Sequence, residues 1–339
     1  MQYFQKKVKK EQKYVTIGTA ITQLNQQKET DMLKISVQSA GWYKKEDPDG
    51  SFAFIKQCGF EAVDFNIDHY LSVKTLVKSE TAPASFFDQP IEDILAFFTP
   101  LKEAAEKHGI SFAQMHAPAP VWIENRLELT DYILMAVEKC LEVCRFVGCP
   151  ALVVHPDRQR DKDLEWQNNI EMYRKLIPAA VRTGVKVCLE NLPTHFNGRL
   201  TDGVCNSAEE VCRYIDTLNA EADCDAFGYC FDVGHANMMG CNLYDHLSKL
   251  GPRLTCLHTH DNNGTSDWHT APYTCVAPAG LQTDWDGFIL GLRRINYRGD
   301  LNFETFRIMR HLPKPLHEKM LCYIAEVGRY FRDRILAQE

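Results

Sequence analysis

The sequence predicts an α/β fold in which one domain forms a (β/α)8 TIM barrel, and three observations support this prediction. Short β-rich runs alternate with longer segments of helical spacing from Met32 onward. Alternating elements of this kind form a parallel sheet, and the eight runs match the number of strands that close into a barrel. Glycine precedes several of the runs, where a helix needs a left-handed residue to end.

The eight predicted strands are short and rich in apolar residues. They occupy residues 33–39, 61–67, 111–117, 151–156, 185–191, 228–234, 255–261 and 301–306. An open, doubly wound sheet would show the same alternation. The closed barrel is favoured because eight is the closure number and because no G-x-G-x-x-G motif follows the first strand.

Two segments between and after these strands have a clear apolar helical face. In each segment, apolar residues recur at intervals of three and four. The first face consists of Ile133, Ala136, Val137, Cys140, Leu141 and Cys144, and the second of Leu316, Met320, Ile324, Val327 and Phe331. Helix ends are predicted at the glycines that precede four strands, which are Gly109, Gly148, Gly184 and Gly299.

The chain divides into an N-terminal extension, residues 1–31, and the barrel, residues 32–339. The first segment is basic and then polar, so we expect it to be poorly ordered, and no Pro-rich linker or shift in composition divides the second. The barrel segment is long enough for a large core, since 45% of the chain is hydrophobic.

Composition also limits the partners and the compartment. A net charge of −7 argues against a nucleic-acid partner, because such binding depends on Lys and Arg. No apolar run approaches the ~18 residues of a membrane span, so no membrane association is expected. The thirteen cysteines form no C-x-x-C pair and are expected to be reduced thiols of a cytoplasmic protein.

Six consecutive predicted strands, from the third to the eighth, end in a side chain that can bind a divalent metal. In order, these residues are His116, His155, Glu190, Asp232, His258 with His260, and Glu304. Because the carboxyl ends of barrel strands meet at one mouth, we expect these groups to lie together. The pattern therefore predicts a metal site at that mouth.

The segment "LHTHDNNGTSDWH", residues 257–269, adds further candidates. His258 and His260 lie two apart on a strand and should point to the same side. Asp267 and His269 follow on the loop and can fold back over the mouth, as can His235, three residues after Asp232. His260 has two other interpretations, which are orientation of His258 and contact with substrate.

Two weaker substrate contacts are also predicted. Arg199 in "HFNGRL" is a candidate for binding an anion or a hydroxyl group, and Asn66, at the end of the second strand, either contacts substrate or stabilises the barrel end.

The chain resembles the xylose isomerase-like barrel superfamily, which includes sugar isomerases and epimerases, inosose dehydratase and endonuclease IV. The motifs that carry the resemblance are "MHAP", "VVHP", "CLEN", "FDVGHA", "HTHDN…DWH" and "DWDGFILGLRRINYRGDLNFET". They span about residues 32–310. The loop "PYTCVAPAGLQTDW" departs from the shorter Gly-rich link that is usual in the superfamily, so the substrate is left undetermined.

The resemblance implies two different ligand sets. The sugar isomerase and epimerase branch holds one divalent ion, Mn²⁺, Co²⁺ or Zn²⁺, through the positions of Glu190, Asp232, His258 and Glu304. The endonuclease branch holds three zinc ions through nine positions, all present here: His116, His155, Glu190, Asp232, His235, His258, Asp267, His269 and Glu304.

The function expected is that of a metal-dependent sugar or sugar phosphate isomerase or epimerase. A metal would stabilise the enediolate that forms when a proton leaves the carbon beside a carbonyl, and Glu190 and Glu304 would serve as the acid and base groups. The alternatives are a polyol dehydratase of the inosose type, a multi-zinc phosphoesterase and a non-catalytic sugar-binding protein. The partner expected is a small sugar or polyol, and the sequence is compatible with a homo-oligomer.

Overall fold

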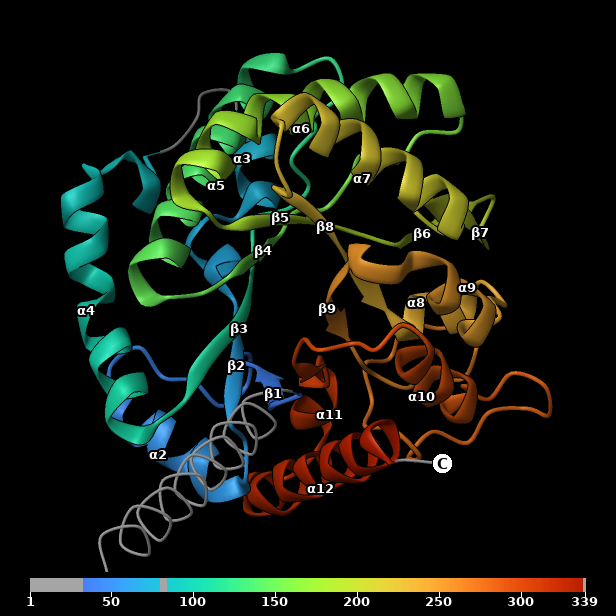
Figure 1. Cartoon of the computed structure of the whole chain (residues 1–339). Helices are drawn as coiled ribbons and strands as arrows, with labels where there is room; N and C mark the ends of the chain where they lie inside the picture. Colours follow the sequence, from blue (N-terminus) through green and yellow to red (C-terminus); the bar gives the residue numbers. More distant parts are fainter. Residues whose placement is uncertain (1–32, 80–83, 338–339) are drawn as a thin grey trace, which may run out of the picture.

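The computed structural model describes residues 33–79 and 84–337, so the predicted extension, residues 1–31, lies outside the described residues (Figure 1). Eight parallel strands lie in the order β10-β1-β2-β3-β4-β5-β8-β9. Their bounds are β1 Ile35–Gln38, β2 Ala62–Phe65, β3 Ser111–His116, β4 Ala151–Val153, β5 Lys186–Glu190, β8 Phe227–Asp232, β9 Leu254–His258 and β10 Leu301–Phe303. Each overlaps a predicted run, although β8 and β9 begin one residue earlier than predicted, and the predicted fold class is confirmed.

A short contact between β9 and β10 brings the two ends of the sheet together. Thr259, just after β9, forms a single parallel bridge with Phe303. The Thr259 amide donates to the Asn302 carbonyl oxygen at 3.0 Å, and the Glu304 amide donates to the Thr259 carbonyl oxygen at 3.1 Å. The barrel is therefore nearly closed, with its narrowest connection beside two of the predicted metal ligands.

Helices cover the outside of the barrel (Figure 1). Their bounds are α2 Pro48–Cys58, α3 Val73–Lys78, α4 Ile91–His108, α5 Leu127–Val147, α6 Lys162–Thr183, α7 Ala208–Ala222, α8 Val233–Met238, α9 Leu243–Leu250, α10 Trp285–Arg294, α11 Phe306–His311 and α12 His317–Leu336. The two predicted apolar faces belong to α5 and α12, where most of the named residues are buried. Leu316 is an exception, because it precedes α12 and is exposed. None of the described helices combines the length and the hydropathy that a membrane crossing requires.

The predicted helix ends are confirmed at three glycines and wrong at the fourth. Gly109, Gly148 and Gly184 are left-handed C-caps. Helix α10 instead ends at Arg294, five residues before Gly299. A Cβ on Gly299 would lie 2.3 Å from the Tyr297 hydroxyl oxygen, so this glycine is needed for close packing and not for a helix end.

One hairpin was not predicted. Strands β6, Leu192–Phe196, and β7, Arg199–Val204, pair antiparallel outside the barrel, directly after β5. Their turn is Asn197-Gly198, both with positive φ, of 49° and 72°. Asn-Gly between two extended runs is the strongest local hairpin signal, so this element could have been found in the sequence.

The cysteines have no disulfide partner. All thirteen are free thiols, and Cys188, Cys230 and Cys256 pack together with Ala151 and Val153 in a small buried cluster formed by strands β4, β5, β8 and β9. Burial raises the pKa of these three thiols well above the ordinary value. They therefore act as small apolar residues of the barrel interior.

Burial of His246 on α9 predicts acid sensitivity. Its ring stacks on Phe231, with ring centroids 5.0 Å apart, and burial lowers its pKa to about 4. The ordinary value of about 6.5 applies to the unfolded chain, so the unfolded state binds the proton more readily. The free energy of unfolding is therefore unaffected above about pH 6.5, the pKa in the unfolded chain. It falls as the pH drops from there toward 4, the approximate pKa in the folded chain.

We expect this effect to lower the free energy of unfolding by roughly 2 kcal/mol between pH 7.5 and pH 5. His246→Phe removes the titration while keeping an aromatic ring, so urea unfolding of the variant should lose that much less stability over the same interval. Parallel pH profiles of the two proteins would contradict the assignment.

Candidate metal centre

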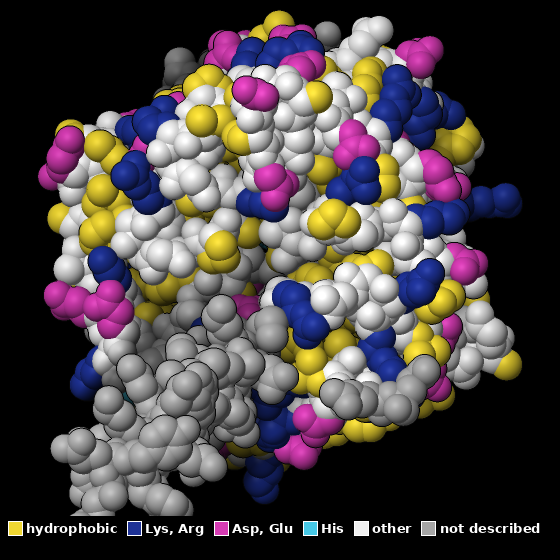
Figure 2. Space-filling model, in the orientation of Figure 1, with side chains coloured by type: hydrophobic (Ala, Val, Ile, Leu, Met, Phe, Trp, Pro, Cys, Tyr) yellow, Lys and Arg dark blue, Asp and Glu magenta, His cyan; other side chains and the backbone are white. Residues whose placement is uncertain are grey.

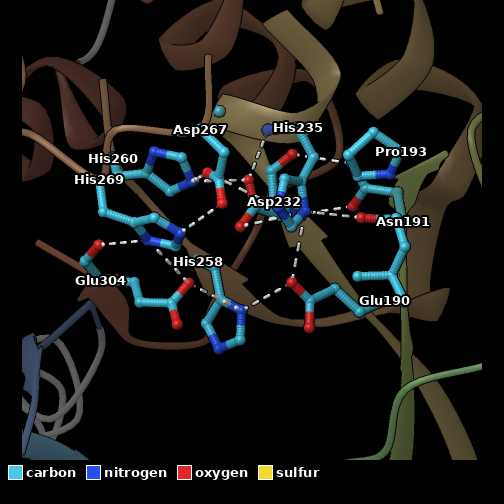
Figure 3. Close-up of polar contacts among 12 residues, drawn as sticks. Glu190, Asn191, Pro193, Asp232, His235, His258, His260, Asp267, His269 and Glu304 are labelled. Atoms are coloured by element: carbon cyan, nitrogen blue, oxygen red, sulfur yellow. Dashed lines mark hydrogen bonds and ion pairs between the residues drawn. The ribbon is translucent and has the colours of Figure 1, made fainter. Parts of the chain in front are cut away.

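Four strands deliver four ligand atoms to one point at the mouth of the barrel. Glu190 ends β5, Asp232 ends β8, His258 ends β9 and Glu304 directly follows β10. One atom from each lies within 4.8 Å of the others, and all four residues are buried. We call them the inner group. Figure 3 shows Glu190 and Glu304 on opposite sides of His258.

His258 stands between the carboxylates of the inner group. Its Nδ1 lies 3.0 Å from Glu190 Oε1 and 3.5 Å from Glu304 Oε2. On the other side of the ring, Nε2 lies 3.3 Å from Oδ2 of the buried Asp64. Asp64 also accepts hydrogen bonds from Gln114 and Asn302, at 3.2 Å and 3.0 Å. Asp64 therefore holds the ring so that Nδ1 faces the carboxylates.

The charges of the inner group call for a cation. Burial raises the pKa of Asp232 to about 6, and it raises the pKa of Glu304 well above the ordinary value. Burial acts to lower the pKa of His258, but Glu304 and Glu190 outweigh it and raise that pKa. Among the described residues, Glu190 Oε2 and Asp232 Oδ2 are buried without a hydrogen-bond donor. The three carboxylates and one imidazole of the inner group are suitable ligands for a divalent metal, which would supply the missing positive charge.

A second cluster, which we call the outer group, consists of His235, His260, Asp267 and His269. His269 Nε2 lies 3.0 Å from Asp267 Oδ2, while His260 Nε2 and His235 Nε2 lie 3.6 Å and 3.8 Å from Asp267 Oδ1. Burial lowers the pKa of all three histidines, so their rings are neutral at pH 7.

A third cluster adjoins the inner group on the side of β3 and β4. His155 Nε2 lies 2.9 Å from both Glu190 Oε2 and His116 Nε2. His116 Nδ1 faces the carbonyl oxygen of Ala117 at 2.9 Å. Glu190 therefore belongs to two clusters, and the nine predicted metal positions lie together with His260 at one mouth.

The two residues predicted as weaker substrate contacts, Asn66 and Arg199, lie apart from the three clusters. The Asn66 side chain accepts hydrogen bonds from the Ser39 hydroxyl at 3.1 Å and the Ala40 amide at 3.2 Å, so it ties loops together. Arg199 begins β7 on the exposed hairpin and does not line the cavity described next.

A cavity of about 560 Å³ opens above these clusters. Its walls include residues that sequence reasoning missed, which are Arg158, Leu192, Pro193, His195, Leu200, Met238, Thr265, Ser266, Trp268 and Phe306. Several come from the unpredicted hairpin. Arg158 donates to the Pro193 carbonyl oxygen at 2.9 Å and so ties the hairpin to the loop after β4. This volume suits a small molecule such as a monosaccharide.

The position of Asp64 predicts that it controls metal affinity without binding the ion. Asp64→Asn removes the charge that faces His258 Nε2, and loss of such a partner costs about 10–100-fold in affinity. We expect this loss in a competition titration with a chelating dye. The matched control, Asn66→Ala, changes another buried side chain, which accepts hydrogen bonds from Ser39 and Ala40. Equal affinities in all three proteins would show that Asp64 does not position His258.

The fold occurs in known proteins. The family model described as "Xylose isomerase-like TIM barrel" matches residues 52–323. An uncharacterised protein, y4fM, of Sinorhizobium fredii is 26% identical over 172 residues, which cover 49% of this chain and 50% of that protein. MJ1311 of Methanocaldococcus jannaschii, also uncharacterised, is 34% identical over 105 residues, 30% of this chain and 32% of that protein. The matched parts thus span half or less of these relatives.

Solved structures resemble the whole barrel. A D-tagatose 3-epimerase-like protein is 19% identical, with a TM-score of 0.63 over 89% of this chain and 98% of that one. The 3-keto-D-glucoside 4-epimerase YcjR from E. coli is 20% identical, with a TM-score of 0.63 over 87% and 99%. At these identities the similarity shows the fold. Together with the family match over most of the sequence, it means that the chain belongs to the xylose isomerase-like TIM barrel family.

Proposed function

We propose that the protein is a divalent-metal-dependent isomerase or epimerase of a sugar or sugar phosphate. The observation that carries this proposal is the inner group, in which two buried carboxylates that line the cavity, Glu190 and Glu304, flank His258. The solved structures with the same fold include a 3-keto-D-glucoside 4-epimerase and a D-psicose 3-epimerase.

Glu190, Asp232, His258 and Glu304 would hold the metal, which would polarise neighbouring oxygens of the substrate. The chain itself supplies proton transfer. Glu190 and Glu304 come from strands on different sides of the mouth, so a sugar between them presents opposite faces to the two carboxylates. One carboxylate removes a proton from the carbon beside the carbonyl and the other returns it.

The side chains that neighbour Glu304 and Glu190 are consistent with a role of these carboxylates in proton transfer. Gln38 Nε2 donates to Glu304 Oε1 at 2.6 Å, and His155 Nε2 lies 2.9 Å from Glu190 Oε2. The hydrogen bond from Gln38 thus fixes the orientation of the Glu304 carboxylate, while His155 lies against Glu190 without a hydrogen bond. Trp268 and Phe306 give the cavity wall aromatic surface against which the apolar face of a sugar ring can pack.

Replacing either carboxylate by its amide tests the proposal. We expect Glu190→Gln and Glu304→Gln to lower kcat/KM by about 10²–10⁴, the range that positioned acid and base groups contribute. The assay is exchange of solvent deuterium into a panel of free and phosphorylated ketoses, followed by product analysis. Glu318→Gln is the control, because Glu318 is exposed, accepts a hydrogen bond from Gln57 and does not line the cavity. Full exchange by both amide variants would rule out the assigned roles.

A multi-zinc phosphoesterase is the second candidate, favoured by the outer group and the third cluster beside the inner group. Against it, Lys and Arg side chains are interspersed with Asp and Glu on the described part of the face in Figure 2, without a continuous basic band. Hydrolysis of abasic-site DNA without any deuterium exchange into ketoses would favour this candidate. Release of water from a cyclic polyol would instead indicate a dehydratase.

A further inference from the structure

Three cationic side chains follow β4 in close succession, and only one of them lines the cavity. Lys162 Nζ donates to Glu165 Oε1 at 2.7 Å, so its charge is paired. The guanidinium of Arg160 lies over the ring of Phe196, 3.7 Å from the ring centre. The third cation, Arg158, forms part of the cavity wall.

The charge of Arg158 is not met by the acidic side chains of its own segment. Asp157 Oδ2 already accepts hydrogen bonds from Gln159 Nε2 and Asn168 Nδ2, both at 2.9 Å. Glu165 Oε2 accepts from the Gln159 amide at 2.9 Å. In the described part of the chain, the one hydrogen bond of Arg158 goes to a backbone carbonyl oxygen, and no carboxylate forms an ion pair with it. The cavity wall therefore contains a positive charge without a counter-charge.

Arg158 is nevertheless held in place. Its Nη1 donates to the carbonyl oxygen of Pro193 at 2.9 Å, and Pro193 lies on β6 only three residues after Glu190. The loop itself is anchored by the buried Asn169 of α6, which accepts from the Asp157 amide at 2.7 Å and donates to the Asp157 carbonyl oxygen at 3.0 Å. A guanidinium has five N–H donors, so the others remain for a ligand.

We propose that Arg158 is a specificity residue, which binds an anionic group of the substrate, a phosphate or a carboxylate, at the end remote from the reacting carbons. The inference rests on the proposed isomerase or epimerase function and names its substrate class. The planar fork of a guanidinium matches two oxygens of either anion. Because the loop and the Pro193 carbonyl already orient Arg158, little conformational freedom is lost when the anion binds.

The strand order sets the direction in which such a substrate lies. Arg158 follows β4 and Glu304 follows β10, with β1, β2 and β3 between these strands in the sheet. The two residues therefore lie on different sides of the mouth, and a sugar whose anion binds Arg158 extends across the inner group toward Glu304. On that far side, the Nη2 of Arg307 lies 3.6 Å from Asp267 Oδ2, so this second cation of the cavity already has a counter-charge.

The sequence favours a different arginine as the anion contact. Arg199 begins β7 and does not line the cavity. Its hairpin instead supplies the Pro193 carbonyl that orients Arg158, together with the apolar side chains of Leu192 and Leu200 in the cavity wall. The hairpin thus contributes to recognition of the anion by positioning a cation that belongs to another loop.

Selenate is the probe for the anion site itself, because anomalous scattering locates its selenium. Crystals of the full-length, metal-loaded protein soaked in selenate should show selenium at hydrogen-bond distance from the Arg158 guanidinium, and Arg158→Met should abolish this peak. Selenium only at Arg307 or at the metal ligands, or no bound selenate, would overturn the proposal. The wild-type result decides the matter even where the variant does not fold, and it requires no turnover.

Substrate preference tests the role of the site. The ketose that exchanges solvent deuterium fastest is compared in three forms, whose terminal carbon bears a hydroxyl, a phosphate or a carboxylate. We expect one anionic form to have a kcat/KM about 10–100-fold above that of the neutral form, the range of a charge-assisted hydrogen bond. Which anionic form is preferred identifies the group that Arg158 binds.

Variants then assign that preference to one residue. Arg158→Met should reduce the ratio of anionic to neutral kcat/KM to near one, and Arg158→Lys should restore part of it. Arg160→Met is the control, because it removes a cation of the same loop that stacks on Phe196 and does not line the cavity. A preference for an anionic form that survives in Arg158→Met would overturn the proposal.

Two further outcomes separate this inference from the proposed function. Equal kcat/KM for the three forms in the wild-type protein would mean that selenate at Arg158 is an adventitious ion only, while the proposed function stands. Absence of deuterium exchange into every ketose would contradict the proposed function, and the selenate experiment would still decide whether Arg158 binds an anion.

Discussion

The buried carboxylate of Glu190 is the group on which the rest of the site depends. It lies at the end of β5, is almost fully buried, and has four imidazoles around it, at distances of 2.9 to 3.9 Å. A carboxylate in this position would be costly without positive charge or donors nearby. His258 and His155 outweigh the effect of burial and hold the pKa of Glu190 well below its ordinary value. The neighbouring side chains are therefore arranged around one negative charge.

The register of the parallel strands brings that charge to its partners. Glu190 pairs with Cys230 across β5 and β8, and Asp232 pairs with His258 across β8 and β9. A shift of register by one residue would turn every inward side chain outward. The irregularity between Tyr229 and Cys230 keeps the ends of β8 and β9 level. The candidate metal ligands are thus positioned by backbone hydrogen bonds, and side-chain contacts refine their orientation.

The sequence predicted the strands and brought most of the candidate ligands to one mouth, because both predictions follow local rules. The carboxyl ends of parallel strands must meet at one mouth, so Glu190, Asp232 and His258 could be placed without knowing any contact. Partners that are distant in sequence could not be placed in this way. Asp64 acts on His258 from a strand almost two hundred residues earlier, and only the structure shows that contact. Gly299 was misassigned because packing against Tyr297, and not a helix end, requires glycine there.

The inner group also bears on how the barrel holds together. Strands β9 and β10 are joined by one bridge at Thr259, the narrowest connection in the sheet. His258 precedes this bridge on one strand and Glu304 follows it on the other, with 3.5 Å between His258 Nδ1 and Glu304 Oε2. A cation bound by both side chains would cross the junction and add a link that the few backbone hydrogen bonds there do not provide. Because an ion that binds only the folded state stabilises it by mass action, metal binding and closure of the barrel should be coupled. The same residues that would perform the chemistry would then complete the fold.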